Sequence, residues 1–596
     1  MAVTQIPNEL IEFGVKTFGT SSIMIGDTTT GTIDAADLNT GLGIDIFEAL
    51  TSGDRNTAIG FNCLNDITTG SQNSFVGSFS GDGITTGSYN AGVGDGALGN
   101  TTTGSSNSGF GRRALFKNTT ADYNTAVGYN ALEENTTGDL NVAIGAFALD
   151  ANTIGDRSVA IGYLSLTAQN PASNTDMYNT AVGHATMAST TTGTENTAVG
   201  GLAMDKNTTG SDNVAIGKGA LEENTTGIRN TAVGRRALVN NTTGQDNEAF
   251  GRHALESNTT GSQNCGLGRA SLNANTTGNY NVAVGYAALG ANTSGVSNTA
   301  IGYGALDAAT SNNNTAVGRD ALGACTTGGH CTAVGLNALK TSTTTSDNTA
   351  FGSGAGLSNT GDSNTMIGRA AMENATSGIH NTAVGMASGL STTTASYSTL
   401  VGRNAGYDQT TGGYNVLVGY NANPSAATGQ VQIAIGYGCK NAYGNYSVTL
   451  GAGTGSDRIY NRFDTNASWT RVSDVRYKEE IQDNTDCGLN FINDLRPITF
   501  TWKAKKDVPT EMSQYEEDVS TPCRGFGETN YGFVAQEVKA VIEKHNLVDG
   551  QNIHRVDPDG THELSPAELV PMLVKALQEA DNKIDALVAR VTTLEG

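Results

Sequence analysis

Hydrophobic and polar residues follow a 17-residue repeat along most of this chain. The repeat is clearest as NTAVGYNALEENTTGDL at Asn124–Leu140. Its two apolar pairs, Ala126-Val127 and Ala131-Leu132, lie in short runs bounded by Gly and by Asn-Thr-Thr-Gly. A helical repeat needs ten or more residues of 3.6 periodicity without Gly, so the pattern favours short β-strands. A fixed period of this kind predicts a solenoid, in which one unit is stacked many times.

We number the repeat from position 1, its opening Asn, to position 17, with the consensus N-x-A-[VI]-G-x-x-A-L-x-x-N-T-T-G-x-x. The chain contains 25 units. They begin at residues 39, 56, 73, 90, 107, 124, 141, 158, 179, 196, 213, 230, 247, 264, 281, 298, 314, 331, 348, 364, 381, 398, 415, 432 and 447. A four-residue insertion around Asn170 to Asn174 and short units before Asn314, Asn364 and Ser447 interrupt the period.

Each unit is predicted to hold two short strands and two turns. Because side chains alternate across a strand, Thr125 and Val127 should share one face and Ala126 the other. We expect the β-branched residue at position 4, such as Val127, to fill the coil interior, and the small Ala at position 3 to face a neighbouring chain. The Asn at position 1 should stack as an amide ladder. The Gly of the NTTG segment should take a positive φ in a turn.

The repeated N-x-[AV]-[VI]-G phrase resembles the left-handed parallel β-roll in the heads of trimeric autotransporter adhesins. Units of 17 residues are also similar to the shafts of bacteriophage tail fibres. The resemblance covers roughly residues 39–455 and implies a homotrimer of solenoids. Composition points the same way, because a thin coil with few large apolar residues buries little surface by itself and gains burial by association.

Beyond Gly455 the composition changes abruptly. Both Trp residues, Trp469 and Trp502, and six of the nine Pro lie there. The segments SDVRYK at 473–478, LRPITFTWK at 495–503, YGFVAQEV at 531–538 and LVPMLVKALQE at 569–579 occur in that order. Together they resemble the intramolecular chaperone of phage tail spikes and fibres, the peptidase S74 type, over about residues 468–596.

Within the first of these segments, Ser473 and Lys478 are candidates for a catalytic dyad. A Ser hydroxyl is a weak nucleophile until a base removes its proton, and a desolvated Lys with a lowered pKa can do so. The resemblance implies that Ser473 attacks the carbonyl of Val472 and cuts the Val472–Ser473 bond, with Lys478 as the general base. Asp474 and Arg476 belong to the matched motif and receive a supporting role. The predicted activity is a single self-cleavage, and nothing indicates turnover on an external substrate.

The last residues are predicted to form a helix with heptad periodicity. One core position holds Val570, Leu577, Ile584 and Val591, and the other holds Leu573, Ala580, Leu587 and Leu594. β-Branched residues at the first position with Leu at the second lean toward dimers. The trimer is therefore an expectation of the two resemblances and not of the heptads.

The predicted fold is mainly β: a trimeric fibrous β-solenoid or β-roll, followed by a small α+β chaperone domain that ends in a coiled coil. We divide the chain into a virion-attachment segment (1–38), the repeat shaft (39–455), a linker to the cleavage site (456–472) and the chaperone and autoprotease (473–596). The coiled coil should cover about residues 566–596.

Charge and cysteine content exclude several partners. Lys+Arg 34 against Asp+Glu 57 gives a net charge of −23, which opposes nucleic acid or an anionic membrane as the main ligand. The seven Cys are scattered without a C-x-x-C pair, which indicates buried thiols and no zinc site. We expect no cofactor and no metal. The chain also lacks an apolar run of ~18 residues and a signal-peptide pattern at its start, so we expect no membrane insertion.

The first functional hypothesis is a structural and adhesive phage tail fibre, made in the host cytoplasm and then part of the virion tail. Its expected partners are further copies of itself, a tail or baseplate protein at the N-terminus, and a host surface glycan or protein receptor. The alternative is a tailspike depolymerase that degrades host surface polysaccharide, which needs paired carboxylates. Acidic residues such as Glu133 and Glu134 recur at a turn position, and we interpret them as a solvated edge. A bacterial surface adhesin is disfavoured by the missing signal peptide and anchor.

One column of the repeat is a candidate receptor-binding ladder. The residue after the repeat Gly, at position 6, is cationic or aromatic in seven successive units: Lys218, Arg235, Arg252, Arg269, Tyr286, Tyr303 and Arg319. Stacked on a solenoid, these side chains would form a stripe able to bind the phosphates or sugars of a glycan. The competing interpretation is a solvated edge. The insertion near Asn170 to Tyr178 is a second candidate, since it makes the largest loop that interrupts the shaft.

Overall fold

A computed structural model describes residues 14–18, 22–26, 35–441, 443–453, 458–462, 470–471, 487–510, 515, 517–521, 529–547, 553–556 and 562–595. The chain separates into two compact units, Met1–Val472 and Ser473–Gly596. Among the described helices, none is both long enough and apolar enough to cross a membrane.

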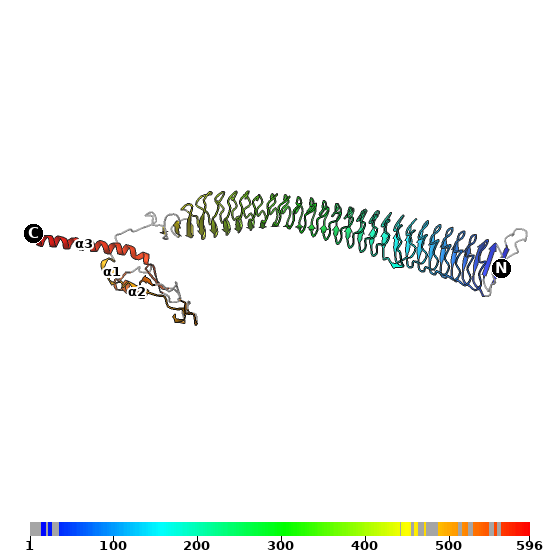
Figure 1. Ribbon diagram of the computed structural model, residues 1–596, viewed down its shortest axis with the longest axis horizontal. Helices are drawn as coiled ribbons and strands as arrows, with labels where there is room; N and C mark the ends of the chain where they lie inside the picture. Colours follow the sequence, from blue (N-terminus) through cyan, green and yellow to red (C-terminus); the bar gives the residue numbers. More distant parts are fainter. Residues whose placement is uncertain are drawn as a thin grey trace, which may run out of the picture. The chain divides into compact units, whose positions relative to one another are not determined.

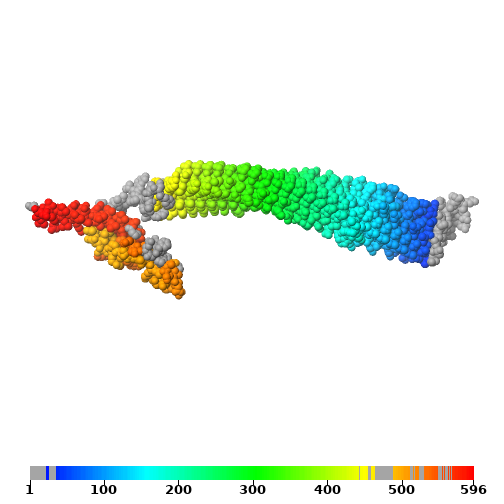
Figure 2. Space-filling view, viewed as in Figure 1, coloured from blue at the N-terminus to red at the C-terminus, as the bar shows by residue number. Residues whose placement is uncertain are grey.

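The first unit is a β-solenoid of about 25 turns of about 17 residues, which confirms the predicted architecture (Figure 1). In the space-filling view the colours follow the chain in order along this rod, so each stretch of its surface comes from a few neighbouring turns (Figure 2). Each turn contributes one short strand that pairs in parallel with the strands of the turns before and after it, for example Thr231 with Glu248 and Val233 with Phe250.

The stacked strands of the rod are β3 (Thr40–Gly43), β4 (Thr57–Ile59), β5 (Ser74–Val76), β6 (Ala91–Val93), β7 (Ser108–Phe110), β8 (Thr125–Val127), β9 (Val142–Ile144), β11 (Val159–Ile161), β13 (Thr180–Val182), β14 (Thr197–Val199), β15 (Val214–Ile216), β16 (Thr231–Val233), β17 (Glu248–Phe250), β18 (Cys265–Leu267), β19 (Val282–Val284), β20 (Thr299–Ile301), β21 (Thr315–Val317), β22 (Thr332–Val334), β23 (Thr349–Phe351), β24 (Thr365–Ile367), β25 (Thr382–Val384), β26 (Thr399–Val401), β27 (Val416–Val418), β28 (Gln432–Ile435) and β29 (Ser447–Gly451).

The prediction of two strands per unit is wrong, because the second apolar pair lies in a turn. In the turn that begins at Asn124, Asn130, Leu132 and Leu140 have φ of 54°, 52° and 60°. These left-handed residues, at positions 7, 9 and 17, bend the chain sharply and cannot continue a strand. Hydrogen bonding between turns nevertheless persists here, since the Leu132 N–H donates to the Ala148 carbonyl at 2.9 Å.

The expected side-chain orientation is also reversed. Ala126 at position 3 is fully buried, whereas Val127 at position 4 is 37% exposed. The reason is space: the interior already holds the buried Leu of position 9 and the buried Asn side chains, so only a methyl group fits beside them. Position 4 therefore points outward in every turn, and its Val, Ile, Leu and Phe residues form a continuous line along the rod that we call the apolar stripe.

Exceptions at position 3 show how tightly the interior is filled. Phe75 occupies this buried position, and Gly replaces the neighbouring residues that would collide with it. A Cβ atom at Gly92 would lie 2.3 Å from the Phe75 ring, and one at Gly81 would lie 2.9 Å from it. In the same way, Leu400 at position 3 faces Gly406 at position 9. A large residue at position 3 thus requires Gly in adjoining positions, since the core has a fixed volume.

The predicted Asn ladder at position 1 is confirmed. The Asn247 N–H donates to the Asn230 side-chain oxygen at 3.1 Å, and the Asn230 amide donates to the Gly244 carbonyl at 2.9 Å. A second ladder at position 12 was not expected: the Asn241 amide donates to the Asn224 oxygen at 2.8 Å, and Asn258 to Asn241 at 2.8 Å. All these amides are buried, so the two ladders satisfy polar groups that a thin apolar core leaves inside.

Gly is required at two positions of the turn, for different reasons. At position 5, Gly234 has a φ of +136°, which other residues rarely adopt. The Gly of the NTTG segment, predicted to have a positive φ, does not have one. At Gly244 the reason is close packing, because a Cβ atom there would lie 2.3 Å from the Gly261 carbonyl oxygen of the next turn.

Antiparallel strands close both ends of the rod's sheet. At the N-terminal end, β1 (Gly14–Phe18) pairs antiparallel with β2 (Ser22–Gly26), and β2 pairs in parallel with β3. At the other end, β29 pairs antiparallel with β30 (Arg458–Arg462), which pairs with β31 (Thr470–Arg471). Antiparallel additions end the repeat and cover the exposed edge that could otherwise template aggregation.

The second unit is a small α+β domain, as predicted. Its elements are α1 (Leu489–Asp494), β32 (Ile498–Phe500), a short 3₁₀ turn η2 (Lys505–Asp507), β33 (Asn530–Gly532), α2 (Ala535–Lys544), β34 (His554–Val556), β35 (His562–Leu564), η4 (Pro566–Leu569) and α3 (Val570–Glu595). The strands form two antiparallel pairs, β32 with β33 and β34 with β35. Its core consists of Cys487, Phe491, Leu495, Val538, Ile542, Ile553 and Leu569.

The helix α3 carries the predicted heptads on its surface. Leu577 is 70% exposed, Ile584 57% and Leu594 84%. Near its start the helix is tied to α1, because the Glu579 carboxylate accepts a hydrogen bond from the Leu489 N–H at 2.7 Å. The rest of the heptad line is exposed among the described residues, and its association with other copies stays a prediction.

Candidate functional site

The position-6 residues of the predicted ladder stand in register along one edge of the rod. Each follows the outward residue of a strand and the Gly of position 5, and the strands β15 to β21 that carry them pair residue for residue. All seven side chains are exposed: Lys218, Arg235, Arg252, Arg269, Tyr286, Tyr303 and Arg319. The geometric part of the prediction, a ladder on the surface, is therefore present, and its role in binding stays a prediction.

Three members of the ladder are stacked on one another. The Arg269 guanidinium lies over the Tyr286 ring at 5.5 Å from its centroid. The rings of Tyr286 and Tyr303 are nearly parallel, at 15°, with centroids 5.2 Å apart. This distance is close to the spacing of adjacent turns, so the two rings stand in register as one stacked platform.

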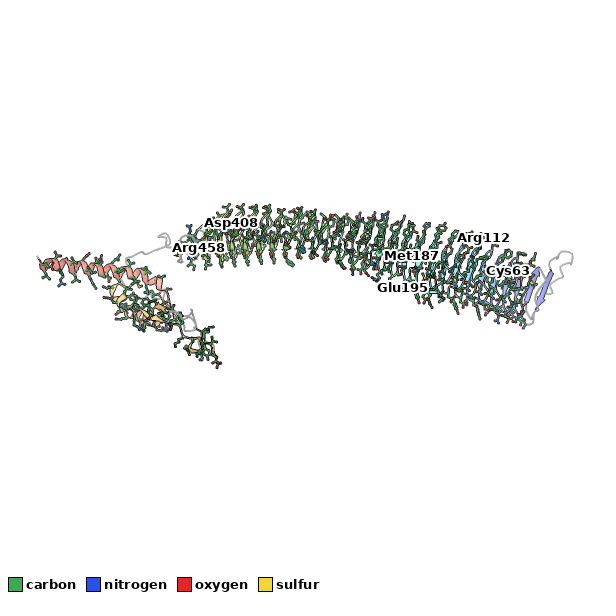
Figure 3. All side chains as sticks on the ribbon, in the orientation of Figure 1. Cys63, Arg112, Met187, Glu195, Asp408 and Arg458 are labelled. Atoms are coloured by element: carbon green, nitrogen blue, oxygen red, sulfur yellow. The ribbon has the colours of Figure 1, made fainter. Side chains whose placement is uncertain are left out.

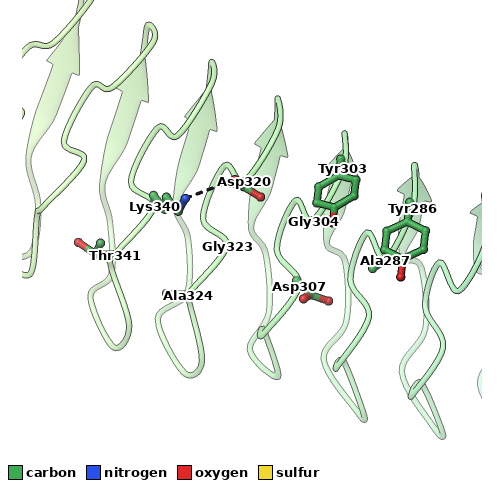
Figure 4. Close-up of a pocket in the computed structure, with 10 residues that line it drawn as sticks. All are labelled: Tyr286, Ala287, Tyr303, Gly304, Asp307, Asp320, Gly323, Ala324, Lys340 and Thr341. Carbon is green, nitrogen blue, oxygen red and sulfur yellow. Dashed lines mark hydrogen bonds and ion pairs between the residues drawn. The ribbon is translucent and has the colours of Figure 1, made fainter.

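Beside the tyrosines lies a hollow of about 340 Å³ (Figure 4). It results from small residues that follow the tyrosines and occupy the next turns: Ala287 and Gly304 at position 7, and Gly323 and Ala324 at positions 10 and 11. Larger side chains fill these positions in most other turns. The hollow is lined by positions 6, 7, 10 and 11 of the repeat, and no residue of the apolar stripe at position 4 lines it.

The polar groups of the hollow are Asp307, Asp320, Lys340 and Thr341, together with the tyrosine hydroxyls. The Lys340 ammonium lies 3.3 Å from the Asp320 carboxylate, which Arg319 also approaches at 3.5 Å. Burial raises the pKa of Asp307, against a hydrogen bond from the Gly290 backbone that lowers it. Aromatic faces flanked by carboxylates and an ammonium suit a polyhydroxylated ligand, because ring faces contact C–H groups while charged groups bind hydroxyls.

The sequence itself contains a signal for this hollow. Aligning the repeats places Ala287 and Gly304 directly after Tyr286 and Tyr303, and Gly323 and Ala324 at positions 10 and 11 of the next unit. The predicted ladder consists of position 6 alone, whereas the hollow also depends on small residues at positions 7, 10 and 11 of neighbouring turns.

The residues predicted for self-cleavage are Val472, Ser473, Asp474, Arg476 and Lys478. All five lie outside the described residues, between β31 and α1. Their roles stay predictions based on the motif and the resemblance.

The insertion near Asn170 forms a small projection from the rod. Its strand β12 (Thr175–Asp176) pairs in parallel with β10 (Gly155–Asp156) of the preceding turn, and Arg157 forms an ion pair with Asp176. Met177 is fully buried and packs over Gly155. The loop is thus anchored at its base, while Ala172, Ser173 and Asn174 are exposed.

The recurring acidic turn position was expected to be a solvated edge, and this expectation is wrong for Glu133, which is buried. Glu133 is only 9% exposed and pairs with Arg113 at 2.6 Å, whereas Glu134 pairs with Lys117 at 2.6 Å nearer the solvent. Each carboxylate thus has a cation on the preceding turn. Among the described residues, no group of three or more His, Cys, Asp or Glu is arranged to hold a metal ion.

Comparison with known families identifies one region. The sequence model of the family "chaperone of endosialidase" matches residues 473–547. The match begins at Ser473, directly after the solenoid unit, and it confirms the resemblance inferred from the C-terminal motifs. No curated protein matches the chain. The chain therefore combines a long β-solenoid with a domain of the chaperone of endosialidase type.

Proposed function

We propose that the protein is a homotrimeric phage tail fibre whose shaft binds a host surface receptor and whose C-terminal domain assembles the trimer and then cleaves itself off. The observation that carries the proposal is the chaperone match that starts where the solenoid unit ends. The N-terminal segment, residues 1–38, is proposed to attach the fibre to the tail or baseplate of the virion. The protein would be made in the host cytoplasm.

The apolar stripe supports the trimer. It includes Ile216 at 42% exposed, Phe250 at 39%, Leu267 at 48% and Phe351 at 57%, all on the same side of the rod. Soluble monomers rarely expose continuous apolar surface on this scale. Two further copies, packed stripe to stripe about a common axis, would bury it. The exposed heptads of α3 offer a second seam for the same association.

The proposed cleavage needs only the chain and one water molecule. Lys478 accepts the Ser473 hydroxyl proton while the Ser473 oxygen bonds to the Val472 carbonyl carbon. The peptide C–N bond then breaks, the released amine takes a proton, and an ester joins Val472 to the Ser473 side chain. Water hydrolyses the ester, which leaves a shaft ending in the Val472 carboxylate and a chaperone beginning at Ser473.

Denaturing mass analysis of the expressed protein tests this step. We expect a shaft product that ends at Val472, and its loss in Ser473→Ala and Lys478→Gln. Lys503→Gln, an exposed Lys of the same domain, is the matched control and should still cleave. An intact wild-type chain in assembled protein would contradict self-cleavage, and light scattering on the same sample would show whether three chains associate.

For receptor binding we propose the hollow beside Tyr286 and Tyr303, with a glycan as ligand. Replacing both tyrosines by Ala should reduce adsorption of the fibre to host cells by at least about tenfold, the loss expected from one stacking platform. Tyr163→Ala is the control, since Tyr163 also occupies position 6 and is 48% exposed, in a distant turn. Equal adsorption of the double variant and wild type would place the receptor site elsewhere. Release of sugar fragments by wild type, lost in Asp307→Asn, would favour the depolymerase.

A further inference from the structure

Position 2 of the repeat points outward beside the apolar stripe, and in 24 of the 25 units it is uncharged. The exception is Glu248, the first residue of β17. Its side chain is exposed, next to the exposed Phe250 of the same strand. One carboxylate on an otherwise uncharged line of Thr, Ser, Val and similar residues is expensive if that face becomes buried, unless a cation meets it.

The cations closest to Glu248 along the rod axis are at position 6, on the other side of the apolar stripe. Position 6 of the turn that holds Glu248 is Arg252, and the run Lys218, Arg235, Arg252 and Arg269 extends over neighbouring turns. Among the described residues, Lys218, Arg235 and Arg252 take part in no ion pair. Elsewhere in the same column, Arg112 pairs with Asp95 at 3.3 Å and Arg319 with Asp320 at 3.5 Å. Within the described ranges, the cations on the turns around Glu248 are thus free of anions of their own chain, as are Arg369 and Arg403 of the same column in distant turns.

Glu248 has no cation of its own chain either, in the described part of the molecule. Its neighbour is the thiol of Cys265, whose pKa is raised by burial and by the Glu248 carboxylate. Positions 2 and 6 flank the outward residue of position 4, one on each side. Figure 3 shows Arg112, of position 6, on one edge of the rod.

A three-fold assembly brings these two flanks together. In a closed ring of three identical chains the contacts are heterologous, so one flank of each copy faces the other flank of the next copy. With the stripe at the common axis, position 2 of one chain then faces position 6 of its neighbour at a similar height. The carboxylate on one flank and the cations on the other flank are therefore complementary to each other, so a second copy of this chain is the partner that fits both.

We propose that Glu248 of each copy pairs with the cationic run of the neighbouring copy, chiefly Arg235, Arg252 and Arg269, and that this contact limits axial slippage. The inference rests on the proposed homotrimer. Slippage is a hazard because the stripe is apolar in every turn, so a shift by whole repeats preserves its contacts. A shift of three turns in either direction places Glu248 opposite Gly201 or Tyr303, with no cation in the column. A single charged group that specifies register resembles the use of one buried polar residue in coiled coils.

Cross-linking between chains tests the placement. In full-length protein with Cys265→Ser, the pair Glu248→Cys and Arg252→Cys should form disulfides under mild oxidation. Denaturing electrophoresis without reductant should then show covalently joined chains, and reductant should return them to monomers. The control pair is Glu248→Cys with Thr260→Cys, because Thr260 is exposed at position 14, outside the two flanks. A trimer by light scattering that forms no joined chains would overturn the inference, whereas a monomer would overturn the homotrimer itself.

A charge-swap cycle tests the interaction. Glu248→Lys and Arg252→Glu should each lower the thermal midpoint of the assembled shaft, and the combined variant should recover about half of the summed loss or more. Arg369→Glu is the matched control, since Arg369 also occupies position 6 but has Thr365 at position 2 of its turn. Its effect should simply add to that of Glu248→Lys. If the losses in thermal midpoint of Glu248→Lys and Arg252→Glu also simply add in the combined variant, the proposed pairing is overturned.

Discussion

The solenoid and the C-terminal domain stabilise their folds by different means. The solenoid interior contains few large side chains, and backbone and Asn hydrogen bonds join residues 16 to 18 apart in neighbouring turns. The domain has a conventional apolar core around Phe491 and Val538. Its elements are joined by contacts between distant residues, such as the Arg496–Glu537 pair and the Lys544–Asp494 pair at 2.8 Å. Repetition thus replaces core volume in the rod, whereas the domain depends on a few large residues.

The two parts also differ in how well their contacts specify one alignment between chains. Each turn of the rod contacts only the turns beside it, and neighbouring turns are nearly identical, so local contacts do not specify one alignment between chains. The domain has a unique set of contacts and no repeat. A unit with a unique structure is suited to align repeats that cannot align themselves, which agrees with a chaperone at one end of the rod.

The largest expected effect is at the Gly of position 5. Gly234→Ala should prevent the rod from stacking, because the new Cβ atom would lie 2.6 Å from the Gly251 carbonyl oxygen at a φ of +136°. We expect a loss on the order of 3 kcal/mol or more, seen as a large drop in the rod's thermal midpoint. Gly201→Ala is the control, since the nearest atom to its Cβ would be 3.9 Å away. Equal tolerance of both changes would contradict close stacking as the reason why Gly recurs at position 5 of the repeat.

The second effect belongs to the C-terminal domain alone. Phe491→Ala removes a fully buried ring and should cost about 3–5 kcal/mol of domain stability. Calorimetry of the full chain should show the domain's transition lowered or lost and the rod's transition unchanged. Tyr531→Ala, at a residue 85% exposed in the same domain, should leave both transitions in place. A shift of the rod's transition by Phe491→Ala would mean that the two parts are not energetically separate.

A smaller effect is expected where the ladders change composition. Ser158 replaces Asn at position 1, and Gln169 replaces Asn at position 12 of the same turn. The longer Gln restores the bonding that the shorter Ser loses: its amide donates to the Ser158 hydroxyl at 3.0 Å, and its oxygen accepts from the Asn179 amide at 2.9 Å. Ser398 and Gln409 repeat the exchange, with the Gln409 amide 3.1 Å from the Ser398 hydroxyl.

We therefore expect Gln169→Asn to lower the rod's stability by about 1–3 kcal/mol, since it leaves buried polar groups unpaired. Ser158→Asn alone should also destabilise the rod, by crowding the Gln. The combined variant returns both positions to the consensus and should be close to wild type in chemical denaturation. Additive losses in the combined variant would contradict the compensation.

The smallest effect is a pH-dependent one in the rod. Burial raises the pKa of Asp82 to about 6, with Asp66 adding to the shift. Because the folded state binds this proton more tightly than the unfolded state, Asp82 costs stability above pH 6, and the cost disappears as the pH falls below about 4. Asp82→Asn should thus raise the thermal midpoint at pH 7.5 by about 1–2 °C and leave it unchanged at pH 4. An equal rise at both values would point to another cause.

How far the sequence leads differs between these features. The 17-residue period, the parallel stacking and the Asn ladder of position 1 follow from the repeat itself, since identical residues at a fixed spacing must lie above one another. The number of strands per turn does not follow, because Leu132 looks like a strand residue and only its left-handed backbone places it in a turn. Nor does the burial of Ala126, because alternation defines two faces without stating which one is inside.

The sequence by itself determined a repetitive β-solenoid, the position of the chaperone domain and its motif, because these depend on local patterns. The tertiary structure decided which side of each strand is buried, and hence that an apolar stripe runs along the outside of the rod. It also decided that small residues in three columns combine into a hollow beside Tyr286 and Tyr303. Both depend on the width of the coil and on how adjacent turns fill it, and volume in three dimensions is not a property of any single position in the sequence.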